Sequence, residues 1–312
     1  MKQSPISPTD IAAFVWAVPP LALDSDGKLK DTDNAALVRH IEAGGVTTLL
    51  YGGNANLYGA TQALFEALID ALPGWAGADT WAIPSVGPDY GKLMDQARAL
   101  AGTAFPAAMA LPMAGPRDQA GTERALRDFA DKAGMPVIIY IRSADYLPAE
   151  RLGAMIGDGT AVAVKYAVEP PDLTVDSYLT AILDTVPGER VVSGIGEIAA
   201  LSHLSAFPMA GFTAGAVCIA PRRATAVLRA LQARRFDEAK TLTRAIEPLE
   251  HLRQAHGPIP VIHEAVTETG IADMGTIRPH FSPVSEAVCA EIRGAARSLL
   301  DAEAELAVTE AA

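Results

Sequence analysis

Short apolar runs alternate with amphipathic, helix-like segments along the first two thirds of the chain. Eight of these runs have the length and apolar content typical of β-strands. They cover residues 11–18, 46–52, 81–87, 107–113, 136–141, 161–166, 190–195 and 214–220. Their starts lie about 24 to 35 residues apart, which leaves room for one helix after each strand. Eight units of this size predict an α/β protein built as a (β/α)8, or TIM, barrel.

An open, doubly wound sheet is the alternative arrangement of the same elements. Dinucleotide-binding sheets of that kind carry GxGxxG directly after the first strand, and this chain does not. Eight units of nearly equal length therefore favour closure of the sheet into a barrel. The sequence has no P-loop either, so we expect no bound cofactor.

The last 90 or so residues have a helical pattern instead of the alternating one. Three stretches carry it, at 223–235, 236–256 and 284–309, and the only strand candidate is a weak one at 260–266. We therefore expect a barrel over residues 1–222 and a C-terminal helical extension over 223–312, packed on the barrel.

The net charge narrows the classes of partner, and the cysteine content indicates the cellular compartment. The formal net charge is −12, which disfavours nucleic acid and anionic membrane surfaces as partners. The two cysteines, Cys218 and Cys289, lie far apart in apolar surroundings, so a reducing cytoplasm is expected. The longest stretch without a charged residue, 198–221, contains Pro208 and several glycines, which favours a strand and loop over a membrane span.

Metal-dependent and serine-dependent hydrolysis lack their usual sequence patterns. The six histidines show neither HxH nor HExxH spacing, so no metal site is predicted. Ser193 lacks the GxSxG context of a nucleophile elbow.

One lysine stands out because of its position. In AVAVKYAVEP (161–170) an apolar strand leads directly into Lys165. Strand alternation places Ala161 and Ala163 on the same face as Lys165, and both are small enough to leave space for a long side chain. On the preceding strand Tyr140 shares a face with Ile138, so the polar ends of Tyr140 and Lys165 are expected to meet at the barrel mouth.

A buried amine at this position has a chemical use. Desolvation lowers the pKa of a lysine, and the neutral amine attacks a carbonyl carbon to form a Schiff base. A neighbouring tyrosine such as Tyr140 is able to transfer protons during that reaction. The alternative is that Lys165 extends to water from the strand end while Tyr140 fills the core.

Six segments in order along nearly the whole chain carry a resemblance to a known family. They are AGGVTTLLYGGNANLYG (43–59), VIIYIR (137–142), VAVKYA (162–167), VVSGIGE (191–197), AGFTAGAVCIAPR (210–222) and TIRPHFSP (276–283). Together they resemble the dihydrodipicolinate synthase and N-acetylneuraminate lyase family of class I aldolases. The resemblance implies that Lys165 is the Schiff-base lysine and that Tyr140 is the proton-relay tyrosine.

The same resemblance implies a substrate-binding set around that lysine. Its members are Gly53, Asn54, Ala55, Asn56, Arg142, Gly194, Glu197 and Val217. Glu197 lies where the lyase branch has a ligand for sugar hydroxyls, and a solvent-facing carboxylate at a helix start is the alternative. Arg142 is a candidate ligand for an anionic substrate, with a surface ion pair as the alternative.

Two departures from the family pattern concern hydroxyl groups. The family loop after strand two usually carries threonine or serine, whereas here it reads Gly53-Asn54-Ala55-Asn56-Leu57. An asparagine amide donates hydrogen bonds to a carboxylate but does not relay protons, and turn formation beside glycine is an equal alternative. The tyrosine that the synthases place after strand four is also missing, because residues 111–114 read LPMA.

Two functions follow from these features. The first is a Schiff-base lyase or aldolase acting on pyruvate or a related 2-oxo acid through Lys165 and Tyr140. The second is a barrel that has lost turnover and only binds a small carboxylate, as the loop without hydroxyls allows. The resemblance further implies a homotetramer or homodimer.

Overall fold

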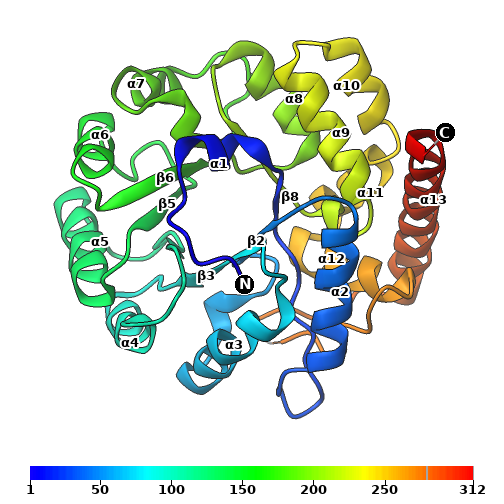
Figure 1. Ribbon diagram of the computed structural model, residues 1–312, viewed down its shortest axis with the longest axis horizontal. Coiled ribbons are helices and arrows are strands. Elements are labelled where there is room, and N and C mark those ends of the chain that lie inside the picture. The colour runs from blue at the N-terminus through cyan, green and yellow to red at the C-terminus, as the bar shows by residue number, and fades with distance from the viewer. Residues whose placement is uncertain (279, 312) are drawn as a thin grey trace.

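The computed structural model describes residues 1–278 and 280–311, and its centre is a closed barrel of eight parallel strands in chain order (Figure 1). The strands are β1 (Trp16–Ala17), β2 (Thr48–Tyr51), β3 (Trp81–Val86), β4 (Ala108–Ala110), β5 (Val137–Ile141), β6 (Ala161–Tyr166), β7 (Val191–Ser193) and β8 (Gly211–Ala214). Strand β1 pairs with both β2 and β8, which closes the sheet. The predicted TIM barrel is therefore confirmed.

A ring of helices encloses the strands, as Figure 1 shows. The helices that follow successive strands are α2 (Asp31–Ala43), α3 (Gln62–Trp75), α4 (Tyr90–Leu100), α5 (Gln119–Ala133), α6 (Ala149–Gly157), α7 (Ser177–Thr185), α8 (Glu197–Ala206) and α9 (Pro221–Gln232). Helix α5 illustrates how the sequence sets the ends. Asp118 accepts a hydrogen bond from the Gly121 amide at 2.6 Å, and Gly134 ends the helix with a left-handed φ of 69°.

The first predicted strand, 11–18, is mostly helix and turn. Residues Pro8–Ala13 form α1, whose N-terminus carries a capping box between Ser7 and Asp10. Only Trp16 and Ala17 pair with neighbouring strands. Ile11 is buried in α1, and a buried apolar residue is equally typical of a strand, so its apolar character did not distinguish the two.

The eighth predicted strand, 214–220, was wrong in position. Strand β8 is Gly211–Ala214, and Ala216–Cys218 form the 3-10 helix η3. All residues of 214–220 are small or apolar, and all are buried. A strand and a buried turn have the same hydrophobic pattern here, so the pattern did not show where the strand ends. Val217 consequently lies in η3 and not in the strand.

The C-terminal third is helical, as expected. It contains α10 (Phe236–Thr243), α11 (Glu247–His256), α12 (Pro258–Glu268) and α13 (Glu286–Ala311). The weak strand candidate 260–266 lies within α12, where Pro258 and Pro260 occupy first-turn positions that need no helical amide partner. The expected division after residue 222 falls inside α9 and stays a prediction.

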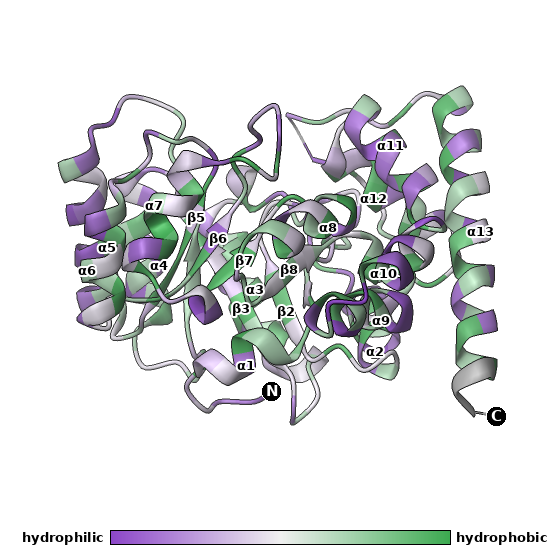
Figure 2. Ribbon diagram, turned by 90° about the horizontal axis from the view of Figure 1, so that it is seen from above, coloured by the Kyte–Doolittle hydropathy of each residue, from purple (hydrophilic) through white to green (hydrophobic). Residues whose placement is uncertain are grey.

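Apolar side chains fill the space inside and around the strands. Figure 2 shows hydrophobic residues along the strands and hydrophilic residues on the outer faces of several helices. In the same view α1 lies at one end of the barrel and α11 near the other. Among the described residues, no helix has both the length and the apolar character that crossing a membrane requires.

Candidate active site

Lys165 projects from β6 into the interior of the barrel and is 4% exposed. Its register partner on β5 is Tyr140, and Nζ lies 4.2 Å from the centroid of the tyrosine ring. Within the part of the chain that the structure describes, this amine makes no hydrogen bond and no ion pair. The alternative in which Lys165 extends to water is therefore wrong.

The glycine turn after β7 leaves space for the lysine. A Cβ atom added to Gly194 would lie 2.9 Å from Lys165 Cγ and 2.9 Å from Ala167 Cβ. Real Cβ atoms do not approach other carbons that closely, so a side chain at position 194 would displace the lysine stem. The missing side chain of Gly194 thus leaves the space that the stem of Lys165 occupies.

Burial is the main cause of an altered lysine pKa. Desolvation, with further contributions from the positive charges of Arg142 and Arg253, lowers the pKa of Lys165 to about 7. About half of the Lys165 side chains are then neutral amines at neutral pH. A neutral amine is the nucleophilic form of lysine.

A cavity of about 160 Å³ surrounds the amine at the ends of the strands. Loops, strands and the C-terminal helices supply its polar lining, which consists of Asn54, Tyr58, Tyr140, Arg142, Lys165, Glu169, Thr213 and Arg253. We call this cavity the lysine pocket. It combines a nucleophile, hydroxyl groups and cations in a small space.

Two phenols line the lysine pocket. Burial raises the pKa of Tyr140, while Arg142 opposes that shift. Burial also raises the pKa of Tyr58, and neighbouring Tyr140 adds to the effect. Both tyrosines are therefore protonated at neutral pH and are able to donate a proton.

Tyr58 was missed in the sequence, although it belongs to the quoted loop YGGNANLYG. It lies in the 3-10 helix η1 (Leu57–Gly59), whose Leu57 and Tyr58 carbonyls accept hydrogen bonds from Lys92 Nζ at 2.8 and 3.0 Å. Tyr58 also lines an outer groove of about 550 Å³. A tyrosine directly after the loop 53–57, which has no side-chain hydroxyl, is the signal that would have identified it.

The candidate residues of the strand-two loop separate into two groups. Gly53 and Asn54 line the lysine pocket, whereas Ala55 and Asn56 line a neighbouring cavity that Asn54 also borders. Asn54 Nδ2 donates to the Val18 carbonyl at 2.7 Å and so ties the loop to the end of β1. Asn56 adopts a left-handed φ of 52°, which supports the interpretation of turn formation.

Two arginines bring positive charge to the lysine pocket. Arg142 is exposed at the end of β5 and forms no ion pair with any described residue, so the surface ion-pair alternative is not supported. Arg253 reaches the pocket from α11, is buried and pairs with Glu250. Its guanidinium packs against Gly215, where an added Cβ would lie 2.8 Å away. Nothing in the helical pattern of the tail predicted this contact.

Glu197 and Val217 do not line the lysine pocket. Glu197 is fully buried at the start of α8, so the alternative of a solvent-facing carboxylate is wrong. Burial, together with the nearby Glu250 carboxylate, raises the pKa of Glu197 to about 8. Val217 is completely buried in η3. The structure places both side chains outside the residues that border the cavity.

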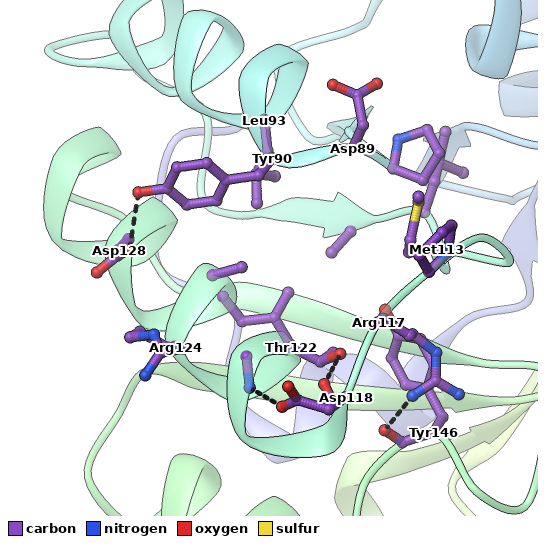
Figure 3. A pocket seen from close by; sticks show the side chains of 17 residues that line it. Asp89, Tyr90, Leu93, Met113, Arg117, Asp118, Thr122, Arg124, Asp128 and Tyr146 are labelled. Atoms are coloured by element: carbon purple, nitrogen blue, oxygen red, sulfur yellow. Dashed lines mark hydrogen bonds between the residues drawn. The ribbon is translucent and has the colours of Figure 1, made fainter.

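A separate cavity of about 430 Å³ lies between α4 and α5 (Figure 3). Tyr90 spans the two helices by donating to Asp128 at 2.9 Å, and Arg117 donates to the Tyr146 carbonyl at 3.1 Å. This cavity shares no lining residue with the lysine pocket. Arg117 and Tyr146 also line the outer groove that Tyr58 borders, so the groove lies between the two cavities.

A possible metal-binding group lies outside the lysine pocket. Glu264, Glu268 and Cys289 approach one another between α12 and α13. Existing contacts engage all three, because the Cys289 thiol donates to Glu264 at 3.0 Å and Arg293 pairs with Glu268. Hydrogen bonding to Glu264 raises the pKa of Cys289 to about 12, which disfavours the thiolate that binds metals.

A closed (β/α)8 barrel with a buried, unpaired lysine on its sixth strand is the class of structure that these features define. No family model and no curated protein matches the sequence. Among solved structures, the chain is similar to dihydrodipicolinate synthase from Bacillus clausii, at 19% identity over 94% of this chain and 98% of that one, with a TM-score of 0.79. It is also similar to the sialic acid aldolase of Ruminococcus gnavus, at 14% identity over 94% and 99%, with a TM-score of 0.80.

A third similar structure is PhdJ bound to a substrate intermediate. The identity is 21%, the match covers 95% of this chain and 98% of that one, and the TM-score is 0.77. At such identities the likeness establishes the fold, which is the one that the sequence motifs predicted.

Proposed function

We propose that the protein is a Schiff-base-forming lyase or aldolase that acts on pyruvate or a related 2-oxo acid. The observation that carries this proposal is Lys165 itself, a buried amine without a hydrogen-bonding partner and with a pKa lowered to about 7. Structural proteins gain nothing from such a group, because burying an amine without a partner destabilises the fold. The similarity to a dihydrodipicolinate synthase and a sialic acid aldolase supports the same chemistry.

In the proposed reaction the neutral Lys165 amine attacks the carbon of the 2-oxo group. A proton moves from nitrogen to the former carbonyl oxygen, which gives a carbinolamine. A second proton then reaches that hydroxyl, water leaves, and a protonated imine links Lys165 to the substrate. The imine withdraws electrons from the adjacent carbon, which permits carbon–carbon bond formation or cleavage, or dehydration.

Tyr140 is the proposed carrier of these protons. Its ring lies 4.2 Å from Lys165 Nζ, and its hydroxyl group is kept protonated by burial. Tyr58 lines both the lysine pocket and the outer groove, so it is placed to exchange protons between Tyr140 and solvent. This phenol supplies a hydroxyl where the loop 53–57 has none.

The carboxylate of the substrate requires positive charge close to the amine. Arg142 lines the pocket without an ion-pair partner among the described residues, and Arg253 lines it while paired with Glu250. We therefore assign carboxylate binding to these two arginines. Asn54 is a weaker candidate because its amide already donates to Val18.

A binding protein without turnover is the second candidate function. The loop 53–57, which lacks serine and threonine, favours it. The presence of Tyr58 and Tyr140 in the lysine pocket favours turnover instead.

Reductive trapping tests the proposal. The protein is incubated with each of a panel of 2-oxo acids and borohydride, and the adduct is located by peptide mass spectrometry. We expect a stable adduct on Lys165 that Lys165→Met abolishes, while Lys132→Met at the exposed end of α5 leaves it intact. If no 2-oxo acid forms an adduct across neutral pH, the imine mechanism is wrong.

A further inference from the structure

A second cavity, of about 440 Å³, lies beside the lysine pocket. The two cavities share only Asn54 and Ile259 in their linings. The walls of the second cavity come from segments 21–27, 54–64 and 259–280, so three parts of the chain meet there. Its volume is within the range of small-molecule sites, whereas the lysine pocket is smaller.

This cavity contains residues that the proposed mechanism does not use. Its lining includes Thr276, Ile277, Arg278 and His280 of the motif TIRPHFSP, of which Pro279 lies outside the described residues. It also includes Asn56, a residue by which this chain departs from the serine and threonine pattern of the resembling family.

Two buried polar atoms of the cavity lining have no hydrogen-bond partner among the described residues. They are Asn56 Nδ2 and His263 Nε2, and His263 as a whole is 9% exposed. Buried polar groups in folded proteins are nearly always hydrogen-bonded. Both atoms are themselves closed to solvent, so a small side-chain rotation accompanies the binding of a molecule whose polar atoms satisfy them.

Arg278 adds a positive charge to the same space. Its guanidinium lies directly against Gly27, where an added Cβ would be 0.7 Å from Nη2. Gly27 has a φ of 80°, so this position favours glycine for its backbone as well as for its missing side chain. Arg278 forms no ion pair with any described residue, although Asp26 also lines the cavity.

We propose that this cavity is a binding site for a small carboxylate, separate from the lysine pocket, with Arg278, Asn56 and His263 as ligands. The guanidinium meets the negative charge, and the Asn56 amide donates to a carboxylate oxygen. Burial lowers the pKa of His263, so its ring is neutral at neutral pH and adds a hydrogen bond without a charge. Asp26 selects ligands that carry a hydroxyl or amino donor in addition to the carboxylate.

The site is coupled to the lysine pocket through Asn54. The side chain of Asn54 borders both cavities and fixes the loop to Val18 at the end of β1. A ligand that contacts Asn56 therefore acts on the same loop. The proposal itself does not depend on imine chemistry.

Titration of the Lys165→Met variant separates this site from the lysine pocket, because that variant forms no adduct. Acetate, lactate, alanine and glutamate are titrated into it by isothermal calorimetry. We expect lactate, alanine or glutamate to bind with a stoichiometry of one and more tightly than acetate. Adding Arg278→Leu weakens binding about tenfold or more, because a charged hydrogen bond is lost.

Two further variants keep the test decisive. Asn56→Asp places a negative charge in the cavity at a left-handed position that aspartate tolerates, so it weakens binding without removing Arg278. Arg244→Leu removes an exposed arginine after α10, outside the cavity, and leaves binding unchanged. Melting temperatures of all variants show whether each one folds. Binding to wild type but not to Lys165→Met, or binding that ignores both Arg278→Leu and Asn56→Asp, overturns the proposal.

Discussion

The pKa of Lys165 governs the pH at which the protein captures a carbonyl. Burial and two neighbouring arginines lower that pKa from 10.5 to about 7, a difference worth about 5 kcal/mol against the charged form. At pH 7 about half of the lysines are neutral, compared with about one in 3,000 for an unperturbed lysine. We therefore expect trapping of pyruvate on Lys165 to be roughly a thousandfold faster at pH 7 than trapping on a solvated lysine.

The assay is the initial rate of adduct formation with pyruvate and cyanoborohydride, followed by intact mass from about pH 5 to about pH 9. The rate is expected to rise with pH and to reach half of its plateau near pH 7. Replacing Arg142 by glutamine removes one of the two positive neighbours and moves the midpoint upwards. Lys132→Met, which changes an exposed lysine, leaves the profile where it is.

A profile that still rises steeply above about pH 9 would refute this reasoning, because it would mean that Lys165 is solvated. An unchanged midpoint in Arg142→Gln would remove that arginine as a cause of the shift.

Three other changes have expected outcomes. Tyr140→Phe lowers turnover by roughly 10²-fold or more, which steady-state rates measure. Tyr58→Phe also lowers the steady-state rate, while the adduct mass shows that borohydride trapping on Lys165 persists. Gly194→Ala forces the lysine stem to move, so trapping slows and the free energy of unfolding falls by about 1–3 kcal/mol in urea titrations. Glu197 makes a contribution to the unfolding free energy that falls as pH rises from about 4.5 towards 8, because the folded protein keeps a proton on Glu197 that the unfolded chain releases. The slope of unfolding free energy against pH is therefore more negative in the wild type than in Glu197→Gln, and equal slopes would contradict this reasoning.

Most of the barrel was predictable because its strands have distinctive apolar patterns. The run 161–166 matches β6, and alternation correctly placed Ala163 and Lys165 on one face. Tyr140 and Lys165 are register partners on adjacent strands, as the two motifs suggested. Side chains alternate between the two faces of a strand, so the sequence shows on which face a polar residue at the strand end lies.

The prediction failed where packing and not periodicity determines the conformation. The run 214–220 is apolar and buried throughout, so nothing in its pattern marked the end of β8 or the turn η3. Tyr58 enters the lysine pocket from a 3-10 turn, and Arg253 enters it from a helix of the tail. Side chains that reach a site from such elements have no fixed spacing relative to the nucleophile, which is why a single sequence did not reveal them.

The pKa of Lys165 depends on two parts of the chain, the barrel strand β6 that carries the lysine and helix α11 of the C-terminal tail. Arg253 arrives from a helix that follows the closed barrel, yet it lowers the pKa of the amine on β6. Exchanging the tail for that of another barrel would therefore retune the nucleophile without altering any strand. Directed evolution of such a scaffold has a route to new substrates through its C-terminal helices, with the barrel strands left untouched.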